Sequence, residues 1–147
     1  MASPTDIAAS AAISDDELAA HWNQLMRYHA RVVCALDRTL GERFGLSSTD
    51  FEVLEQLVLA GRDAKMSDVA DRVHLSQSAF SRTFSRLEKA GYVERATCSE
   101  DRRAVQTNPT PAGRRLYAKA RPVQRATLRD EAQDCEGGLL KHSCLPQ

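Results

Sequence analysis

The sequence predicts a mainly α-helical fold, in which a long helix at each end of the chain flanks a compact unit with a small β-hairpin. Apolar residues recur every three or four positions over residues 14–45, which indicates a long amphipathic helix. Two shorter segments with this spacing follow between residues 66 and 91, separated by a short turn. Two strand-like runs then enclose an arginine-rich loop, and a second long helical segment begins near residue 110.

A capping motif marks the start of the first helix. Ser14 is followed three residues later by Glu17, so each side chain can accept a hydrogen bond from the other residue's backbone amide. The apolar stripe runs from Leu18 to Leu40, and the helix is expected to end near Gly41–Gly45. A stripe of this length cannot be buried against one small domain, so we expect a helix of a second subunit to cover it.

Hydroxyl side chains and glycines predict the limits of the next two helices. Ser48 or Thr49 is expected to cap the second helix, and Gly61 is expected to end it. Ser67 is expected to cap a short third helix. The turn that follows contains Leu75, whose side chain we expect to be buried between the third and fourth helices.

The fourth helix is expected to run from a cap at Ser76 to Gly91, with Phe80, Phe84 and Leu87 on its buried face. Two short helices joined by a tight turn form a helix-turn-helix, whose second helix enters the major groove of DNA. Helical spacing places the polar residues of this segment on or near the opposite face. With the cap, the predicted DNA-binding residues of the helix are Ser76, Gln77, Ser78, Ser81, Arg82, Ser85 and Lys89.

The residue types on this face suit contact with DNA. Small side chains at the helix start permit a close approach to base edges, and their hydroxyls suit phosphate oxygens. Gln77 can pair with adenine, and Arg82 can pair with guanine or hold a phosphate. The alternative interpretation is an ordinary solvated face of serine, arginine and lysine.

Two short strands with a charged loop follow the fourth helix. Residues 92–96 are expected to pair with residues 105–107, and Pro109 is expected to shorten the second strand because it lacks a backbone donor. An arginine in such a loop, or wing, can enter a narrow minor groove, where the negative potential is enhanced. The loop residues predicted to bind DNA are Asp101, Arg102 and Arg103. The alternative is a solvent-exposed hairpin tip, where ion pairs contribute little.

The last helix is expected to begin at Thr110, with Pro111 in its first turn, and to be kinked at Pro122. The expected organisation is a disordered N-terminus (1–13), a dimerisation helix (14–45), a winged helix-turn-helix DNA-binding domain (46–109), a C-terminal dimerisation helix (110–134) and an irregular tail (135–147).

Basic charge is concentrated in the segment that carries these features. The chain has no net charge, but residues 62–121 hold 13 Lys or Arg against 7 Asp or Glu, whereas residues 1–61 hold 4 against 9. A local positive field attracts nucleic acid even where the total charge is zero. The asymmetry therefore favours double-stranded DNA as a partner.

The four cysteines show no spacing typical of a disulfide framework or a zinc site. Cys34 is expected to be a small core residue of the first helix. Cys98 is expected to be exposed near the tip of the wing, where its oxidation offers a redox-responsive alternative. Cys135, His142 and Cys144 lie in a segment without helical pattern, and we predict no metal and no cofactor.

Several protein classes are disfavoured by what the sequence lacks. It has no apolar run of the roughly 18 residues that a transmembrane helix needs, and its N-terminus lacks the pattern of a signal peptide, so a cytoplasmic protein without membrane contact is expected. Motifs of phosphate-binding loops, serine hydrolases and metalloproteases are also missing, so we do not expect an enzyme.

These features in this order resemble the MarR family of bacterial transcriptional regulators. The resemblance covers about residues 14–132 and is most specific in LSQSAFSRTFSRLEKAGYVER (75–95), in SEDRRA (99–104) and in the TPAG helix start that follows. It implies a homodimer whose first and last helices intertwine, and whose winged helices bind a pseudo-palindromic operator. It also implies release of DNA by a small, often aromatic anion or by oxidation of a cysteine. The tail beyond residue 134 departs from the family pattern.

The sequence therefore predicts a DNA-binding transcriptional regulator, and a repressor is the specific form that we expect. A winged helix used for protein–protein contact is the alternative, but such a surface needs exposed apolar residues on the second helix. Candidate effector-binding residues are Trp22, Met26 and His29, which lie on one side of the first helix. The alternative for these three residues is packing in the dimer interface.

The wing prediction can be tested by substitution. Arg103→Ala is expected to weaken DNA binding and to lower the slope of log affinity against log salt by about one unit, because one phosphate-neutralising cation is lost. Binding to a DNA duplex over a range of salt concentrations measures this slope. An unchanged slope would exclude a wing contact by this residue.

Overall fold

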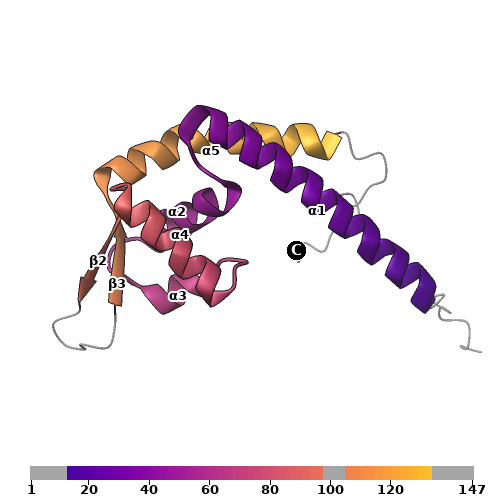
Figure 1. The fold of residues 1–147 in the computed structure, drawn as a ribbon, viewed down its shortest axis with the longest axis horizontal. Coiled ribbons are helices and arrows are strands. Elements are labelled where there is room, and N and C mark those ends of the chain that lie inside the picture. Colours follow the sequence, from indigo (N-terminus) through magenta and orange to yellow (C-terminus); the bar gives the residue numbers. More distant parts are fainter. Residues whose placement is uncertain (1–12, 98–104, 134–147) are drawn as a thin grey trace, which may run out of the picture. The chain divides into compact units, whose positions relative to one another are not determined.

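The structure is a computed structural model that describes residues 13–97 and 105–133. Its helices are α1 (Asp15–Phe44), α2 (Ser48–Ala60), α3 (Met66–Ala70), α4 (Gln77–Lys89) and α5 (Pro111–Gln133), and its strands are β1 (Ala64–Lys65), β2 (Val93–Thr97) and β3 (Val105–Pro109) (Figure 1). The predicted class, mainly α-helical with a small sheet, is confirmed. The chain divides into two compact units, residues 1–31 and 32–147, and α1 contributes to both.

The predicted capping motif of α1 is present. Ser14 Oγ accepts a hydrogen bond from the Glu17 amide at 3.2 Å, and Glu17 Oε2 accepts one from the Ser14 amide at 2.9 Å. The Ser14 amide and the Ser14 hydroxyl, the latter at 2.9 Å, both donate to the Glu17 carboxylate and lower the pKa of Glu17, because they stabilise its ionised form. The helix ends at Phe44, and Gly45 has the positive φ of 66° that glycine adopts easily at a helix end.

The two parts of α1 differ in burial. In the N-terminal unit, the apolar side chains Leu18, Trp22 and Met26 are exposed. In the second unit, Leu36 and Leu40 are buried with the core. The expectation that Cys34 is a core residue was wrong, because it is exposed. Two residues along a helix correspond to a rotation of about 200°, which turns Cys34 away from the face of Leu36.

The cap of α2 is Ser47, so the prediction of Ser48 or Thr49 was wrong. Ser47 has the extended backbone of a cap residue, and its Oγ accepts a hydrogen bond from the Asp50 amide at 3.0 Å. Asp50 Oδ2 accepts the reciprocal bond from the Ser47 amide at 2.9 Å. Ser48 and Thr49 already lie within the helix. The acid three residues after Ser47 therefore identifies the cap.

The start of α3 also differs from the prediction. Ser67 is not the cap, because the helix begins at Met66 and the preceding Lys65 makes no side-chain capping bond. Lys65 belongs to β1, a two-residue strand that the sequence did not predict and that leads directly into α3. In the turn after α3, Leu75 is half-buried and not fully buried as expected.

The α4 prediction is confirmed at its cap and on its buried face. Ser76 Oγ accepts a hydrogen bond from the Ala79 amide at 3.2 Å. Phe80, Phe84 and Leu87 are all buried, and the ring centroids of the two phenylalanines are 6.1 Å apart. The helix contacts α2, whose own core residues are Phe51, Val53, Leu54 and Leu57.

The sheet has the order β1-β3-β2, with both pairs antiparallel. Pro109 was expected to shorten β3, and this prediction was wrong. The residue is paired with Val93 at the end of the strand. The Thr110 amide donates to the Tyr92 carbonyl oxygen at 3.0 Å, so in an alternating antiparallel ladder the Val93–Pro109 pair is not hydrogen-bonded. The missing donor of Pro109 therefore faces away from β2, and β1 does not extend that far along β3.

Helix α5 begins where expected, after Thr110, and continues through Pro122. Thr110 Oγ1 accepts a hydrogen bond from the Gly113 amide at 3.1 Å and donates one to the Gly91 carbonyl oxygen at 2.7 Å. A Cβ atom on Gly113 would lie 2.0 Å from the Tyr92 carbonyl oxygen. Only glycine therefore allows the first turn of α5 to lie this close to the start of β2.

None of the helices within residues 13–97 and 105–133 combines the length and apolarity needed to cross a membrane.

The burial of Phe84 predicts a large loss of stability on truncation. Phe84→Ala is expected to lower the free energy of unfolding by about 3–5 kcal/mol, since the fully buried ring would leave a cavity. Urea unfolding followed by circular dichroism measures the loss. The matched control is Leu59→Ala on the exposed side of α2, with an expected change within about 0.5 kcal/mol. A loss under about 1 kcal/mol for Phe84→Ala would show that the ring is not part of the core.

Candidate nucleic-acid interface

The polar face of α4 is exposed, because its apolar face is buried in the core. All seven helix residues predicted to bind DNA have exposed side chains: Ser76, Gln77, Ser78, Ser81, Arg82, Ser85 and Lys89. Gln77, Ser81 and Arg82 make no side-chain hydrogen bond or ion pair to any other described residue. Their hydrogen-bond donors and acceptors are therefore available to a binding partner.

Three of the serines on this face, Ser76, Ser78 and Ser85, are already hydrogen-bonded. Ser76 caps the helix, and its Oγ lies 3.2 Å from Ser78 Oγ. Ser85 Oγ accepts a hydrogen bond from Arg95 Nη2 at 2.9 Å. A hydroxyl can still donate while it accepts, so these contacts orient the serines without removing their capacity to bind an oxygen of DNA.

Arg95 connects strand β2 to α4, a contact that the sequence did not predict. Besides Ser85, its guanidinium contacts Glu88, with Nε 3.2 Å from Oε2. Its Cζ also lies 5.0 Å from the centroid of the Phe84 ring, within the range of a cation–π contact. Strand β2, which leads into the wing, is thereby held against α4.

A second contact holds the turn of the helix-turn-helix. Glu52 on α2 accepts hydrogen bonds from the His74 amide at 2.8 Å and pairs with His74 Nδ1 at 3.0 Å. Through this carboxylate the turn is tied to α2, on which α4 also packs. The position of the polar face relative to the core is therefore fixed from its N-terminal end as well.

The remaining candidate residues of the wing lie outside the described part of the structure. They are Asp101, Arg102 and Arg103, with Cys98 as the candidate redox residue. Cys135, His142 and Cys144 also lie outside it. No group of three His, Cys, Asp or Glu residues suited to a metal ion occurs among the described residues.

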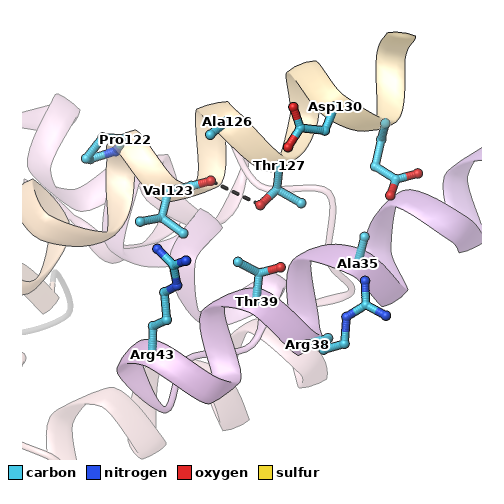
Figure 2. Close-up of a pocket in the computed structure, with 10 residues that line it drawn as sticks. Ala35, Arg38, Thr39, Arg43, Pro122, Val123, Ala126, Thr127 and Asp130 are labelled. Atoms are coloured by element: carbon cyan, nitrogen blue, oxygen red, sulfur yellow. Dashed lines mark hydrogen bonds between the residues drawn. The ribbon is translucent and has the colours of Figure 1, made fainter. Parts of the chain in front are cut away.

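The candidate effector residues Trp22, Met26 and His29 are exposed on the N-terminal part of α1. The second unit contains a cavity of about 470 Å³ between the C-terminal half of α1 and α5 (Figure 2). Arg38 and Arg43 contribute to its α1 side, and Asp130 to its α5 side. The cavity is further lined by Ala35, Thr39, Pro122, Val123, Ala126, Thr127 and Glu131.

Tyr117 and Glu55 join α5 to α2. The Tyr117 hydroxyl donates to Glu55 Oε1 at 3.1 Å, and Arg125 pairs with the same oxygen. The Tyr117 ring also lies against Phe51, with centroids 5.7 Å apart. Burial raises the pKa of Tyr117 above its ordinary value, and the hydrogen bond to Glu55 and its negative charge act in the same direction.

Comparison with known proteins identifies relatives of this arrangement. Residues 44–104 match the sequence model of the MarR family. The transcriptional regulator BldR from Sulfolobus solfataricus is 29% identical over 88% of this chain and 94% of its own, with a TM-score of 0.74. AbsC, a MarR family transcriptional regulator from Streptomyces coelicolor, is 29% identical over 81% of this chain and 80% of its own, with a TM-score of 0.71.

A third structure shares the fold at lower identity. BpsR from Bordetella bronchiseptica, whose DNA binding is regulated by 6-hydroxynicotinic acid, is 23% identical over 76% of this chain and 83% of its own, with a TM-score of 0.69. No curated protein matches the sequence. The resemblance to the MarR family and the winged-helix fold are confirmed by these matches.

The contact between Tyr117 and Glu55 predicts an unusual alkaline titration. Because the folded state favours the neutral phenol, stability from this group is present below the unfolded pKa and is lost as pH rises through the folded pKa. The difference in tyrosinate absorbance between wild type and Tyr117→Phe is expected to have its midpoint above the ordinary value of 10.0. In urea the midpoint is expected to return to that value. A folded-state midpoint at or below it would contradict the contact.

Proposed function

We propose that this chain acts as a repressor. The premise is that it has the central sequence and the fold of a MarR-family DNA-binding transcriptional regulator. In this proposal, a homodimer binds a pseudo-palindromic operator, and a small effector relieves the repression. Proteins of this family are DNA-binding regulators and not enzymes, so the site is a surface for recognition and not for catalysis.

The observation that carries the proposal is the exposed polar face of α4. Gln77, Ser81 and Arg82 are free of described partners on a helix whose other face is buried. The contacts of Arg95 and His74 hold this helix at both ends. A rigid helix with unpaired donors and acceptors suits base recognition in the major groove.

Phosphate contacts complete the proposed interface. The serines at positions 76, 78, 81 and 85 suit phosphate oxygens, and Lys89 supplies a positive charge at the other end of α4. We assign Asp101, Arg102 and Arg103 to the wing contact, with Asp101 orienting Arg103 through an ion pair. The excess of basic residues over residues 62–121 supports this assignment.

The apolar surface of α1 supports a homodimer. This helix exposes a large apolar surface, which consists of Leu18, Trp22, Leu25 and Met26. A single helix cannot bury its own stripe, and exposed apolar patches of this kind mark association surfaces. The cover that we propose is the α1 helix of a second copy. Two copies related by a two-fold axis match two half-sites of an operator.

An organic anion is the proposed effector. Trp22, Met26 and His29 remain candidate contacts on the N-terminal unit. A separate candidate is the cavity between α1 and α5 in the second unit, where Arg38 and Arg43 supply cationic groups. The regulation of BpsR by 6-hydroxynicotinic acid shows that a protein of this fold responds to an aromatic acid. Redox control through Cys98 is the alternative route of regulation.

A protein–protein role for the winged helix is the competing function. Such a role needs apolar anchors on the outer face of α4. The residues exposed there are polar or charged, and the aromatic residues of the helix are buried. DNA is therefore the favoured partner.

Selection and sedimentation test the proposed function together. The full-length protein is used to select duplexes from a random pool, and the mass of the free protein and of the complex is then measured. A palindromic consensus bound by two copies of the chain is the expected result. Recovery of no consensus would overturn sequence-specific binding, and a monomer at the working concentration would overturn the homodimer.

A further inference from the structure

We propose that Arg86 is a positioning residue for operator recognition, which fixes the orientation of α4 through the buried carboxylate of Asp50. The inference rests on the proposed DNA-binding function. It assigns to Arg86 a role different from that of Arg82, although both arginines project from the same helix.

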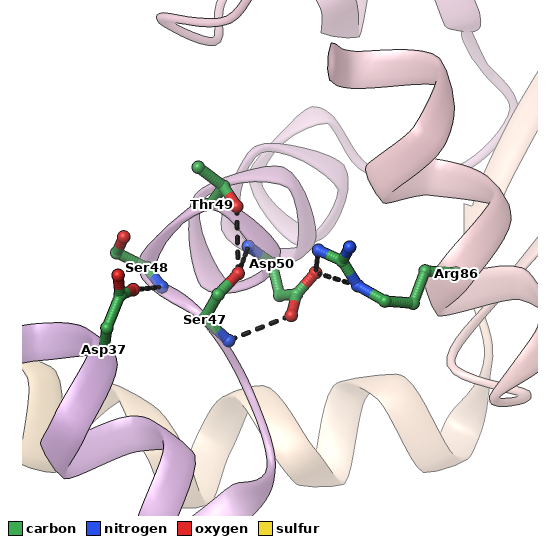
Figure 3. A network of polar contacts seen from close by, with 6 residues as sticks. All are labelled: Asp37, Ser47, Ser48, Thr49, Asp50 and Arg86. Atoms are coloured by element: carbon green, nitrogen blue, oxygen red, sulfur yellow. Dashed lines mark hydrogen bonds and ion pairs between the residues drawn. The ribbon is translucent and has the colours of Figure 1, made fainter.

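The carboxylate of Asp50 is shared between two elements (Figure 3). Its Oδ1 accepts a hydrogen bond from Arg86 Nε at 3.0 Å and also pairs with Arg86 Nη2. Its Oδ2 accepts the hydrogen bond from the Ser47 amide that caps α2. The Asp50 side chain is only 7% exposed, so both of its oxygens depend on these protein partners.

The same cluster reaches the C-terminal half of α1. The Ser48 amide donates to Asp37 Oδ1 at 2.7 Å, and Ser47 Oγ lies 2.9 Å from Thr49 Oγ1. Asp37 belongs to the part of α1 that lies in the second unit. The start of α2 is therefore bonded to α1 on one side and, through Asp50, to α4 on the other.

Arg86 is poorly placed to leave this cluster for a phosphate. Its departure would leave the buried carboxylate of Asp50 without its charged partner, which is a costly state. Arg82, one turn earlier, is exposed as Arg86 is, but it has no described partner that it would have to leave. Arg82 is therefore the arginine available to DNA, and Arg86 is the one retained by the protein.

The orientation of α4 matters most for base contacts. The apolar side chains Phe80, Phe84 and Leu87 hold the helix on the core, but apolar contact is non-directional. The charged hydrogen bonds between Arg86 and Asp50 have a defined direction and restrict rotation of the helix. A small rotation would misalign Gln77 with a base edge, whereas phosphate contacts tolerate it better. Loss of Arg86 should therefore reduce specificity more than general affinity for DNA.

The test compares three variants of the full chain with wild type: Arg86→Gln, Arg86→Lys and Arg82→Gln. Binding is measured to the duplex selected by the wild-type protein and to an unrelated duplex, over a range of salt concentrations. Arg86→Gln is expected to weaken binding to the selected duplex by about tenfold and to leave the unrelated duplex and the salt slope unchanged. Arg86→Lys, which keeps a donor for Asp50, should restore part of the specificity. Arg82→Gln should lower the salt slope by about one unit.

A fold control separates positioning from stability. Urea unfolding establishes that each variant is folded at the binding temperature. If Arg86→Gln is unfolded, the double variant Asp50→Asn/Arg86→Gln carries the test, because it removes the buried charge together with its partner. Its expected phenotype is a folded protein with reduced specificity.

Two results would overturn the inference. A reduction of the salt slope by about one unit in Arg86→Gln, with equal losses on both duplexes, would show a direct phosphate contact. Wild-type specificity in a folded Arg86→Gln variant would show that Arg86 does not position α4. A wild-type protein that selects no consensus duplex contradicts the proposed function instead, so the two failures are distinguishable.

Discussion

The burial of one face of α4 against α2 determines how the rest of the domain is arranged. Phe80, Phe84 and Leu87 are buried at spacings of four and three residues, which leaves the polar residues of the helix on the surface. Because a helix rotates by about 100° per residue, the inner and outer faces cannot be chosen independently. Burying the aromatic side chains and presenting Gln77 and Arg82 to a partner are therefore two consequences of one interaction.

Three carboxylates on α2 then hold the elements that surround it. Asp50 pairs with Arg86 on α4, Glu52 with His74 in the turn before α4, and Glu55 with Tyr117 and Arg125 on α5. Each of these acids is at least partly buried, so the loss of its partner would leave a carboxylate that water solvates only in part. Helix α2 thus links the helix-turn-helix to the C-terminal helix.

Much of the fold could be predicted because its signals are local. The start of α1 follows from a serine and a glutamate three residues apart, and the buried face of α4 follows from a periodicity. Where three hydroxyl residues stand together at the start of α2, the local signal was still present, since Asp50 selects Ser47 as the cap. The prediction for Pro109 was wrong because the effect of a proline depends on whether its missing amide faces a neighbouring strand. That depends on the order and register of the sheet, which the strand's own sequence does not specify.

The periodicity of the sequence is enough to predict the helices and the polar face of α4, because these depend on residues within a few positions of one another. The partners of the charged side chains were settled only by the tertiary structure. Asp50 and Arg86 are 36 residues apart, and Glu55 and Arg125 are 70 residues apart. Arg82 and Arg86 are alike in sequence, and only the packing of α4 on α2 brings one of them to a buried carboxylate and leaves the other free. The reason is physical: the energy of a charge depends on its burial and on its nearest partner, and neither is a property of the residue itself.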